Sequence, residues 1–194
     1  SLLPDLSNLL VKYLYSTYVS FYDTQDFSYP VELKTDDRGW LFELIKSPHA
    51  GQIFVSRTRP GITRGNHYHD TKIEKFCVIQ GEGAIRFRNV LGRGEEREKA
   101  NTEHPSPNSQ RSEVRVQRSE EGKDEHPTSN IQHPTSNEGV IEYRVNDREI
   151  RIVDIPPGYT HSIENTGTTD MLTIFWANEI FDPNRPDTYA MPVK

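Results

Sequence analysis

Two histidines and a glutamate stand close together in a run that begins and ends with glycine. From Gly61 to Gly81 the run reads G-x5-H-x-H-x4-E-x6-G, and it contains His67, His69 and Glu74. On a β-strand, residues two apart point to the same face, so the imidazoles of His67 and His69 can face one metal ion. Glu74 follows after a short turn and can add a carboxylate oxygen from the next strand. These residue types at this spacing predict a metal site.

A second run supplies a third histidine. Pro156 to Asn165 reads P-x-G-x2-H-x3-N, a tight turn that delivers His161 onto an adjacent strand. Three imidazoles and one carboxylate suit zinc, iron, manganese, nickel or copper, and the donor set does not choose among them. A zinc ion with four protein ligands is usually structural, so a catalytic ion would need room for a further ligand. Both roles are open at this point.

Short strands must position these ligands. Between residues 40 and 177 the chain holds several runs rich in branched and aromatic residues, separated by Gly, Asn-Asp or Pro-Gly turn signals. Many short strands at close spacing are typical of an all-β sandwich or barrel. Strands are expected at Trp40–Ile45, Gln52–Thr58, Glu74–Gln80, Ala84–Phe87, Val140–Val145, Glu149–Ile155, Thr160–Glu164 and Met171–Ala177. Trp40 and Trp176 are expected in the core.

Two segments lie outside this array of strands. Apolar residues from Leu2 to Tyr22 recur at steps of three and four, which predicts one amphipathic helix followed by a polar connector. Residues 91–139 hold almost no large apolar side chains, so we expect a disordered insertion between two strands. Each of its histidines precedes proline in a polar tract and is interpreted as a solvated residue: His104, His126 and His133. The chain is therefore divided into a helix and linker at 1–36 and one β-domain at 37–194, interrupted at 91–139.

The composition limits the classes of partner. The 194 residues suffice for one domain, and they carry a formal net charge of −6 without a Lys/Arg block that would suit nucleic-acid phosphates. No apolar stretch reaches the ~18 residues of a membrane span. We expect no nucleic-acid partner and no membrane partner. Cys77 is the only cysteine, so no intrachain disulfide can form, and a cytoplasmic protein is expected.

The two histidine-bearing runs resemble the two motifs of the cupin superfamily, which implies a double-stranded β-helix, a jelly-roll-like barrel. The first motif is matched completely, and the second carries Ile150 where cupins usually have glycine. A closer resemblance covers about residues 3–91 and 140–189 and is to the C-terminal cupin domain of the bacterial capsular polysaccharide synthesis bifunctional reductase/epimerase. It rests on several runs, among them Gly61–His69, Asp154–Gly167 and Phe181–Tyr189. Residues 91–139 are unlike this family.

This resemblance implies a function. In the family, the cupin domain binds zinc and is associated with C3 epimerisation of a UDP-linked 4-keto-6-deoxy amino sugar in the UDP-N-acetyl-L-fucosamine pathway. The resemblance thus implies a sugar-nucleotide epimerase, an isomerase, with one divalent metal ion, a UDP-sugar substrate and a homodimeric state. Two alternatives are a non-catalytic sugar-nucleotide or metabolite-binding cupin and an iron-dependent cupin oxygenase.

The family also implies a second domain. A dehydrogenase domain precedes the cupin, and the helix at Leu2 to Tyr22 resembles its last helix and linker. The chain starts at Ser1 and holds no G-x-x-G-x-x-G nucleotide loop, so the reductase activity is expected outside this chain.

The acid–base and anion-binding residues are less constrained than the ligands. Candidates to move the substrate proton are Lys72, Tyr143 and Tyr159, although a tyrosine in a barrel is more often a packed ring. Three arginines lie just before or within the first motif, and they either hold the diphosphate or are ordinary charges at a strand edge: Arg57, Arg59 and Arg64.

Overall fold

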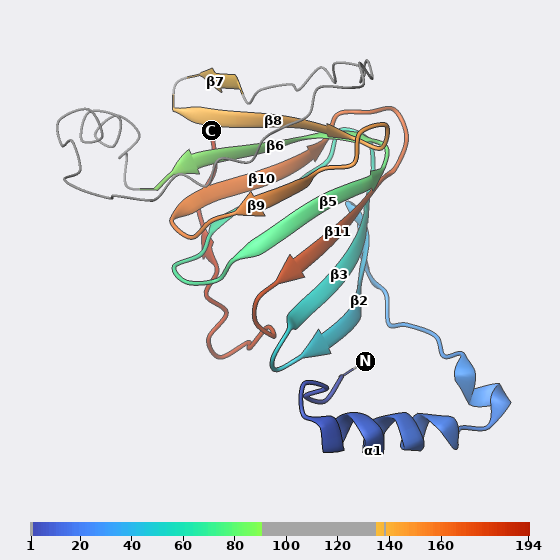
Figure 1. Cartoon of the computed structure of the whole chain (residues 1–194). Coiled ribbons are helices and arrows are strands. Elements are labelled where there is room, and N and C mark those ends of the chain that lie inside the picture. The colour runs from blue at the N-terminus through green and yellow to red at the C-terminus, as the bar shows by residue number, and fades with distance from the viewer. Residues whose placement is uncertain (1, 91–134, 138) are drawn as a thin grey trace, which may run out of the picture.

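The computed structural model describes residues 2–90, 135–137 and 139–194, and it is built around two antiparallel β-sheets (Figure 1). Sheet A has the strand order β1-β2-β3-β11-β5-β9. Its strands are β1 (Lys34–Asp36), β2 (Gly39–Ser47), β3 (Gly51–Thr58), β5 (Glu74–Gln80), β9 (Ile152–Ile155) and β11 (Met171–Ala177).

Sheet B has the strand order β12-β4-β10-β6-β8-β7. Its strands are β4 (Thr63–Tyr68), β6 (Glu82–Asn89), β7 (Thr135–Asn137), β8 (Val140–Asn146), β10 (Tyr159–Asn165) and β12 (Tyr189–Ala190). From β3 to β6, and again from β8 to β11, each successive strand lies in the opposite sheet. This alternation is the double-stranded β-helix of cupins, and the predicted all-β fold class with an N-terminal helix is confirmed.

The core lies between the two sheets because alternate residues of each strand point inward. Phe76 and Val78 of β5 meet Ile85 and Phe87 of β6, and all four are at most 5% exposed. The remaining buried members of this cluster are Val145, Val153, Ile155, Ile163 and Met171. These side chains hold sheet A against sheet B, and thereby fix the distance between residues that the two sheets contribute to a shared site.

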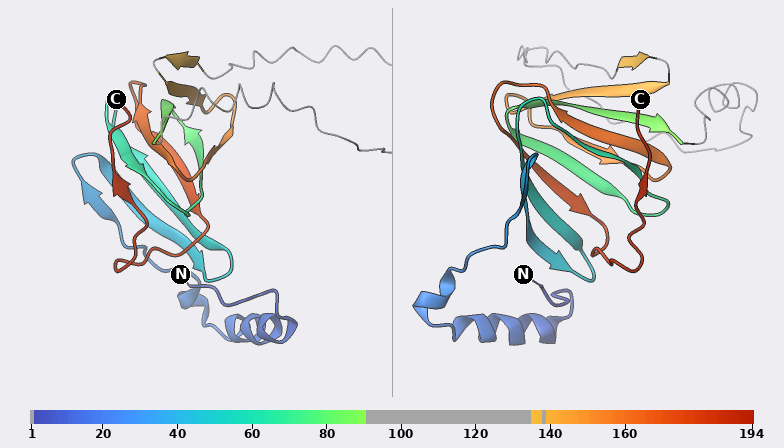
Figure 2. Two further views of the ribbon diagram at one scale, coloured as in Figure 1. Left: turned by 90° about the vertical axis from the view of Figure 1, so that its left-hand side faces the viewer. Right: turned by 180° about the vertical axis from the view of Figure 1, so that it is seen from behind.

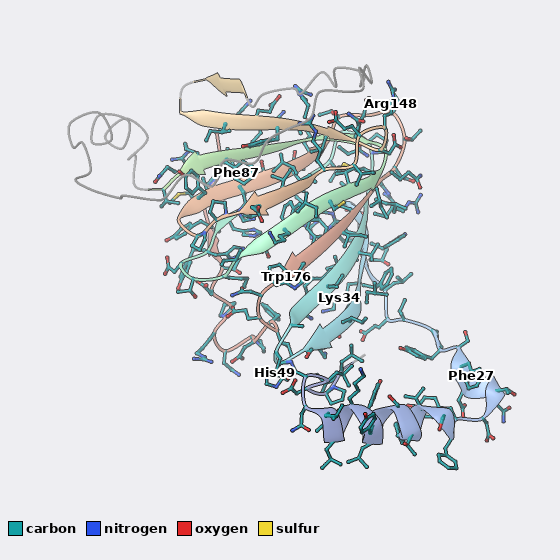
Figure 3. The ribbon with its side chains drawn as sticks, in the orientation of Figure 1. Phe27, Lys34, His49, Phe87, Arg148 and Trp176 are labelled. Carbon is teal, nitrogen blue, oxygen red and sulfur yellow. The ribbon has the colours of Figure 1, made fainter. Side chains whose placement is uncertain are left out.

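The predicted N-terminal helix is present but shorter than the periodicity suggested. Helix α1 (Leu9–Ser20) begins after Asn8, whose side chain accepts hydrogen bonds from the amides of Leu10 (3.0 Å) and Val11 (3.2 Å). None of its residues is buried, and it lies at the end of the barrel where β2 and β3 meet (Figure 2). A short 3-10 helix, η1 (Thr24–Phe27), follows, and Phe27 projects from this segment away from both sheets (Figure 3). No helix in the described part of the chain is long and apolar enough to cross a membrane.

Most predicted strands are found, and the structure adds β1, β4 and β12, for which no range was predicted. Other predictions differ from the structure. The strand expected at Glu149–Ile155 begins only at Ile152, and the two tryptophans expected in the core lie on the outward face of sheet A, beside Arg57 and Lys75. Strand β7 lies inside the segment that was predicted to be a disordered insertion, and it pairs with β8, which follows that segment. The rest of that predicted insertion, including His104, His126 and His133, lies outside the described residues.

Candidate metal centre

The four predicted ligands come from both sheets. His67 on β4 lies directly opposite His161 on β10 in sheet B, and Glu74 is the first residue of β5 in sheet A. His69 follows the end of β4. Strands β4 and β10 pair in sheet B, and β5 of sheet A contacts β10 across the core, where the Phe76 and His161 rings lie 5.7 Å apart. Residues far apart in sequence therefore converge at one end of the core.

The distances within this cluster suit a metal ion. One potential ligand atom from each of the four residues lies within 4.8 Å of all the others. Glu74 Oε2 is 3.3 Å from His69 Nε2 and 3.4 Å from His161 Nε2. Two ligand atoms bound at ~2.0–2.1 Å with a tetrahedral angle lie roughly 3.4 Å apart. The cluster could therefore accept one ion with little rearrangement.

The histidine nitrogens are oriented for metal binding. His69 Nδ1 lies 2.5 Å from the carbonyl oxygen of Asp187, and His161 Nδ1 lies 3.3 Å from that of Tyr159. A carbonyl oxygen only accepts hydrogen bonds, so each Nδ1 carries the proton and each Nε2 presents a lone pair. Among the described residues, neither of these buried Nε2 atoms has a hydrogen-bond partner, although Glu74 Oε2 lies 3.3–3.4 Å from each. A buried polar atom of this kind is costly unless something binds it.

The charge states also suit a cation. Burial, and then the neighbouring imidazoles of His161 and His69, lower the pKa of His67 to about 4, so this ring is neutral at pH 7. Burial alone would raise the pKa of Glu74, but the imidazoles of His161 and His69 outweigh it and hold that pKa well below its usual range. A neutral imidazole and an ionised carboxylate are the forms that coordinate metals.

Two glycines bring the ligand-bearing segments together. Gly65 has φ +94°, and a Cβ there would lie only 2.8 Å from the carbonyl oxygen of His161, so only glycine lets β4 approach β10 this closely. Gly158 has φ +76° in the turn before β10, and its amide donates to the carbonyl of His69 (2.8 Å). The turn before His161 is thus hydrogen-bonded to His69, which is another of the predicted ligands.

Two cavities open onto the cluster. The larger has a volume of about 460 Å³ and is lined by His67, His69 and Glu74 together with Lys72 and Thr188. The smaller, of about 240 Å³, lies beside Arg38, Arg64 and Ser56. They share a wall made of Leu41, Phe54, His67 and Glu74. A substrate in either cavity can therefore reach the cluster.

The structure places one of the three predicted acid–base residues beside a cavity and the other two against the core. Lys72 is 5% exposed and lines the larger cavity, where its Nζ donates to the Pro186 carbonyl (2.7 Å) and to Thr188 Oγ1 (3.1 Å). Tyr143 and Tyr159 instead pack on the hydrophobic core, and neither is among the described residues that line the two cavities. Of the three, the structure brings only Lys72 to the cavities.

Of the three predicted anion-binding arginines, the structure likewise places one beside a cavity. Arg64 is partly buried on the smaller cavity, with its Nε 3.0 Å from Thr58 Oγ1. Arg57 forms an ion pair with Asp170 on the outer face of sheet A, and Arg59 donates to the Asp37 carbonyl (3.2 Å). Neither of these two lines either cavity in the described part of the chain.

Sequence reasoning missed two residues near the cluster. Arg38 joins Arg64 on the smaller cavity and pairs with Asp36 at 2.5 Å. Asp187 contacts the segment between His69 and Glu74. The only signal for Asp187 was its place in the run Phe181–Tyr189, and a resemblance over such a run does not say what each residue does.

Comparison with known proteins identifies the relatives. The family model for the polysaccharide biosynthesis C-terminal domain matches residues 34–107 and 128–189. A UDP-2-acetamido-2,6-beta-L-arabino-hexul-4-ose reductase of Pseudomonas aeruginosa is 35% identical over 184 residues, which are 95% of this chain and 37% of that protein. The unmatched residues 108–127 are fewer than the segment 91–139 that the resemblance had set apart from the family.

Solved structures agree with this match. The capsular polysaccharide assembling protein CapF of Staphylococcus aureus is 42% identical with a TM-score of 0.71, over 98% of this chain and 40% of that one. CapF with the inhibitor 3-isopropenyl-tropolone has the same identity and TM-score, over 98% of this chain and 42% of that one. The chain spans less than half the length of these relatives. It belongs to the polysaccharide biosynthesis C-terminal domain family and has the cupin fold.

Proposed function

We propose that this domain epimerises a UDP-linked 4-keto-6-deoxy amino sugar at C3, with one divalent metal ion, most simply Zn²⁺, held by His67, His69, Glu74 and His161. The product would serve as a precursor of capsular or other surface polysaccharide. One observation carries the proposal: two buried Nε2 atoms without a hydrogen-bond partner among the described residues lie beside an ionised carboxylate, and that carboxylate, Glu74, is on the wall shared by two cavities. Solvent-accessible space beside the ligands favours a catalytic ion over a purely structural one.

The relatives support the substrate class. The name of the Pseudomonas protein describes a UDP-linked sugar with a ketone at C4 and an acetamido group at C2. The Staphylococcus protein assembles capsular polysaccharide and is inhibited by a tropolone, whose two adjacent oxygens can chelate a metal ion. A metal-dependent reaction on such a ketone agrees with both names.

The chemistry follows from the ketone. A C4 carbonyl makes the neighbouring C3–H acidic, and loss of that proton leaves an enediolate whose negative charge spreads onto the C4 oxygen. Return of a proton to the opposite face of C3 inverts that carbon without net oxidation or reduction. A bound divalent ion supplies Lewis acidity that stabilises negative charge on the oxygen.

The residues of the chain would divide this work. Lys72 places a buried positive charge on the wall of the larger cavity, where it can stabilise the charge that develops during deprotonation. Arg38 and Arg64 together face one nearby carboxylate, Asp36, which is 2.5 Å from Arg38 and 3.9 Å from Arg64. Glu74 adds a second carboxylate to the smaller cavity, but a bound divalent ion would offset its charge, and the cavity would then have an excess of positive charge that suits the diphosphate of the substrate.

Deuterium exchange tests this proposal. The full chain is incubated in heavy water with the UDP-linked 4-keto sugar, without nicotinamide, and loss of the C3–H signal is followed by NMR. We expect exchange that stops with a chelator, returns with Zn²⁺ and slows on the order of 10²–10³-fold in Lys72→Met. Lys46→Met is the matched control, since Lys46 lines the same cavity but pairs with Glu43 at 3.0 Å.

Other results would favour the alternatives. A folded, metal-loaded chain that binds the UDP-sugar but exchanges no hydrogen would be a binding module. Oxygen uptake by the iron-loaded chain would indicate an oxygenase.

The relatives are longer than this chain, and we propose that a dehydrogenase domain completes the natural protein and performs the reduction. We also propose a homodimer. The outward face of sheet A supports it, because one row of apolar side chains crosses five strands in register: Phe42, Val55, Ile174, Cys77 and Ile152. An ion pair flanks this row on each side, Arg57 with Asp170 and Lys75 with Asp154. In a two-fold dimer the same surface of each subunit meets the other. Because the charged residues on this surface already form ion pairs, like charges of the two subunits would not repel each other strongly.

A further inference from the structure

The segment between β11 and β12 returns to the mouth of the barrel and contacts the residues that join two predicted ligands. Pro186, Asp187 and Thr188 lie against residues 69–72, which connect His69 to the strand that begins with Glu74. The run Phe181–Tyr189 was notable in the sequence, and the proposed reaction assigns it no role.

One residue makes most of these contacts. The Asp187 carboxylate accepts hydrogen bonds from three successive amides, those of Asp70 (2.9 Å), Thr71 (3.0 Å) and Lys72 (2.7 Å). It also accepts one from Thr71 Oγ1 at 2.9 Å. The start of the connection from His69 to Glu74 is therefore anchored to a single side chain.

The backbone of the same residue contacts a ligand directly. The Asp187 carbonyl oxygen accepts the Nδ1–H of His69 at 2.5 Å, while His69 Nε2 faces Glu74 and His161. Asp187 has φ +41°, in the left-handed region that non-glycine residues seldom adopt. Such a conformation is strained and persists only where surrounding contacts stabilise it.

We infer that Asp187 is a positioning residue of the metal centre: its carbonyl sets the tautomer and direction of the His69 ring, and its carboxylate holds the connection between His69 and Glu74. This inference rests on the proposed function, since it assumes that the four ligands bind a metal ion. Partners of this kind around a metal centre typically alter metal affinity by ~10–100-fold when they are removed.

The test compares Zn²⁺ affinity by chelator competition in the full chain. Asp187→Asn retains the size of the side chain and the tolerance for positive φ, but its amide group cannot accept from all of the amides at once. We expect the Zn²⁺ dissociation constant to rise roughly 10–100-fold. The visible spectrum of the Co²⁺-loaded variant should change as well, because it reports the geometry of the ligands rather than the stability of the fold.

Asp182→Asn is the matched control. It makes the same substitution in the same segment, but among the described residues the Asp182 carboxylate pairs only with near neighbours in sequence, Asn184 N at 2.9 Å and Arg185 at 3.7 Å. Its Zn²⁺ affinity and Co²⁺ spectrum should match those of the wild type. If Asp187→Asn does not fold, Thr71→Val removes one of the four hydrogen bonds and should weaken Zn²⁺ binding in the same direction by a smaller factor.

Unchanged Zn²⁺ affinity and an unchanged Co²⁺ spectrum in folded Asp187→Asn would overturn the inference and leave the proposed metal centre intact. If Asp187→Asn does not fold and Thr71→Val is measured instead, unchanged Zn²⁺ affinity and an unchanged Co²⁺ spectrum in Thr71→Val would also overturn the inference. A wild-type chain that binds no Zn²⁺ at all would overturn both.

Discussion

Gly65 shows how a single residue determines whether the ligands can meet. It lies two residues before His67 and takes φ +94° where β4 crosses close to the backbone of His161. A side chain there would be strained by the backbone conformation and would also press against a carbonyl of the neighbouring strand. The two effects can be separated, because Gly61 has φ +73° in the preceding turn with no atom within 4 Å of its added Cβ.

The first prediction compares these glycines. Gly61→Ala should lower the free energy of unfolding by about 1–2 kcal/mol, the cost of a left-handed alanine. Gly65→Ala should cost more and should also weaken Zn²⁺ binding, because β4 must move away from His161. Urea unfolding and chelator competition measure the two effects. Equal losses of stability in both variants, with Zn²⁺ affinity unchanged in each, would show that the close approach at Gly65 is unimportant.

At the scale of elements, three strands of sheet B are joined by a charged ladder. Arg86 on β6 contacts Glu142 on β8 (2.6 Å) and Glu164 on β10 (2.5 Å). Burial alone would raise the pKa of Glu142, but the hydrogen bond from Arg86 and the charges of Arg86 and Arg144 outweigh it and lower that pKa. The ladder therefore stabilises the fold while the carboxylate is ionised.

The second prediction is a pH dependence. Since the folded-state pKa of Glu142 is depressed, its contribution is present above the unfolded value near 4.5 and is lost as the pH falls through the folded value. Arg86→Met should lower the free energy of unfolding by about 1–2 kcal/mol at pH 7, and the difference from wild type should shrink toward pH 3. Arg185→Met, at an ion pair whose arginine is 89% exposed, should cost less than about 0.5 kcal/mol. A difference for Arg86→Met that stays constant from pH 7 to pH 3 would contradict this account.

The elements also show what sequence could and could not predict. The ligands could be predicted because strand periodicity is local, so the spacing of His67 and His69 already places both near one ion. Asp187 could not, because it is 118 residues from the His69 ring that it contacts, and only the completed fold brings them together.

It was harder still to predict from the sequence which face of each strand points toward the core. Strand β2 carries Trp40, Leu41 and Phe42 in succession, so both of its faces are apolar and the alternation does not tell which one points inward. Trp40 was expected in the core, although it lies on the outward face beside Arg57. The edge strands β1 and β12 have three and two residues, too few for any periodic signal.

At the scale of the whole molecule, the apolar row across sheet A leads to the third prediction. Ile152, at the edge of this row, is 67% exposed, so a lysine there should be tolerated by the monomer. Light scattering should give a dimeric mass for the wild-type chain and a monomeric mass for Ile152→Lys. Ile150→Lys, 54% exposed but outside the row, is the control and should remain dimeric. A monomeric wild type would exclude a homodimer of this chain, and a dimeric Ile152→Lys would place the interface elsewhere.

The metal ion, if bound, would also link the two sheets, because Glu74 belongs to sheet A whereas His67 and His161 belong to sheet B. Removing the ion should lower the melting temperature of the whole domain. The effect of losing one ligand should likewise reach both sheets rather than remain local.

Metal content per chain, measured by elemental analysis after purification and dialysis, tests the central claim most directly. The wild type should hold one divalent ion, and so should His49→Ala, whose exposed side chain lies at the β2–β3 turn (Figure 3), 3.6 Å from Asp5, and is not a member of the cluster. His67→Ala, Glu74→Ala and His161→Ala should each hold well below one ion and should melt at lower temperature. Full occupancy in any of these three variants, or a wild type that retains no metal after incubation with Zn²⁺, would contradict the metal centre and the reaction proposed from it.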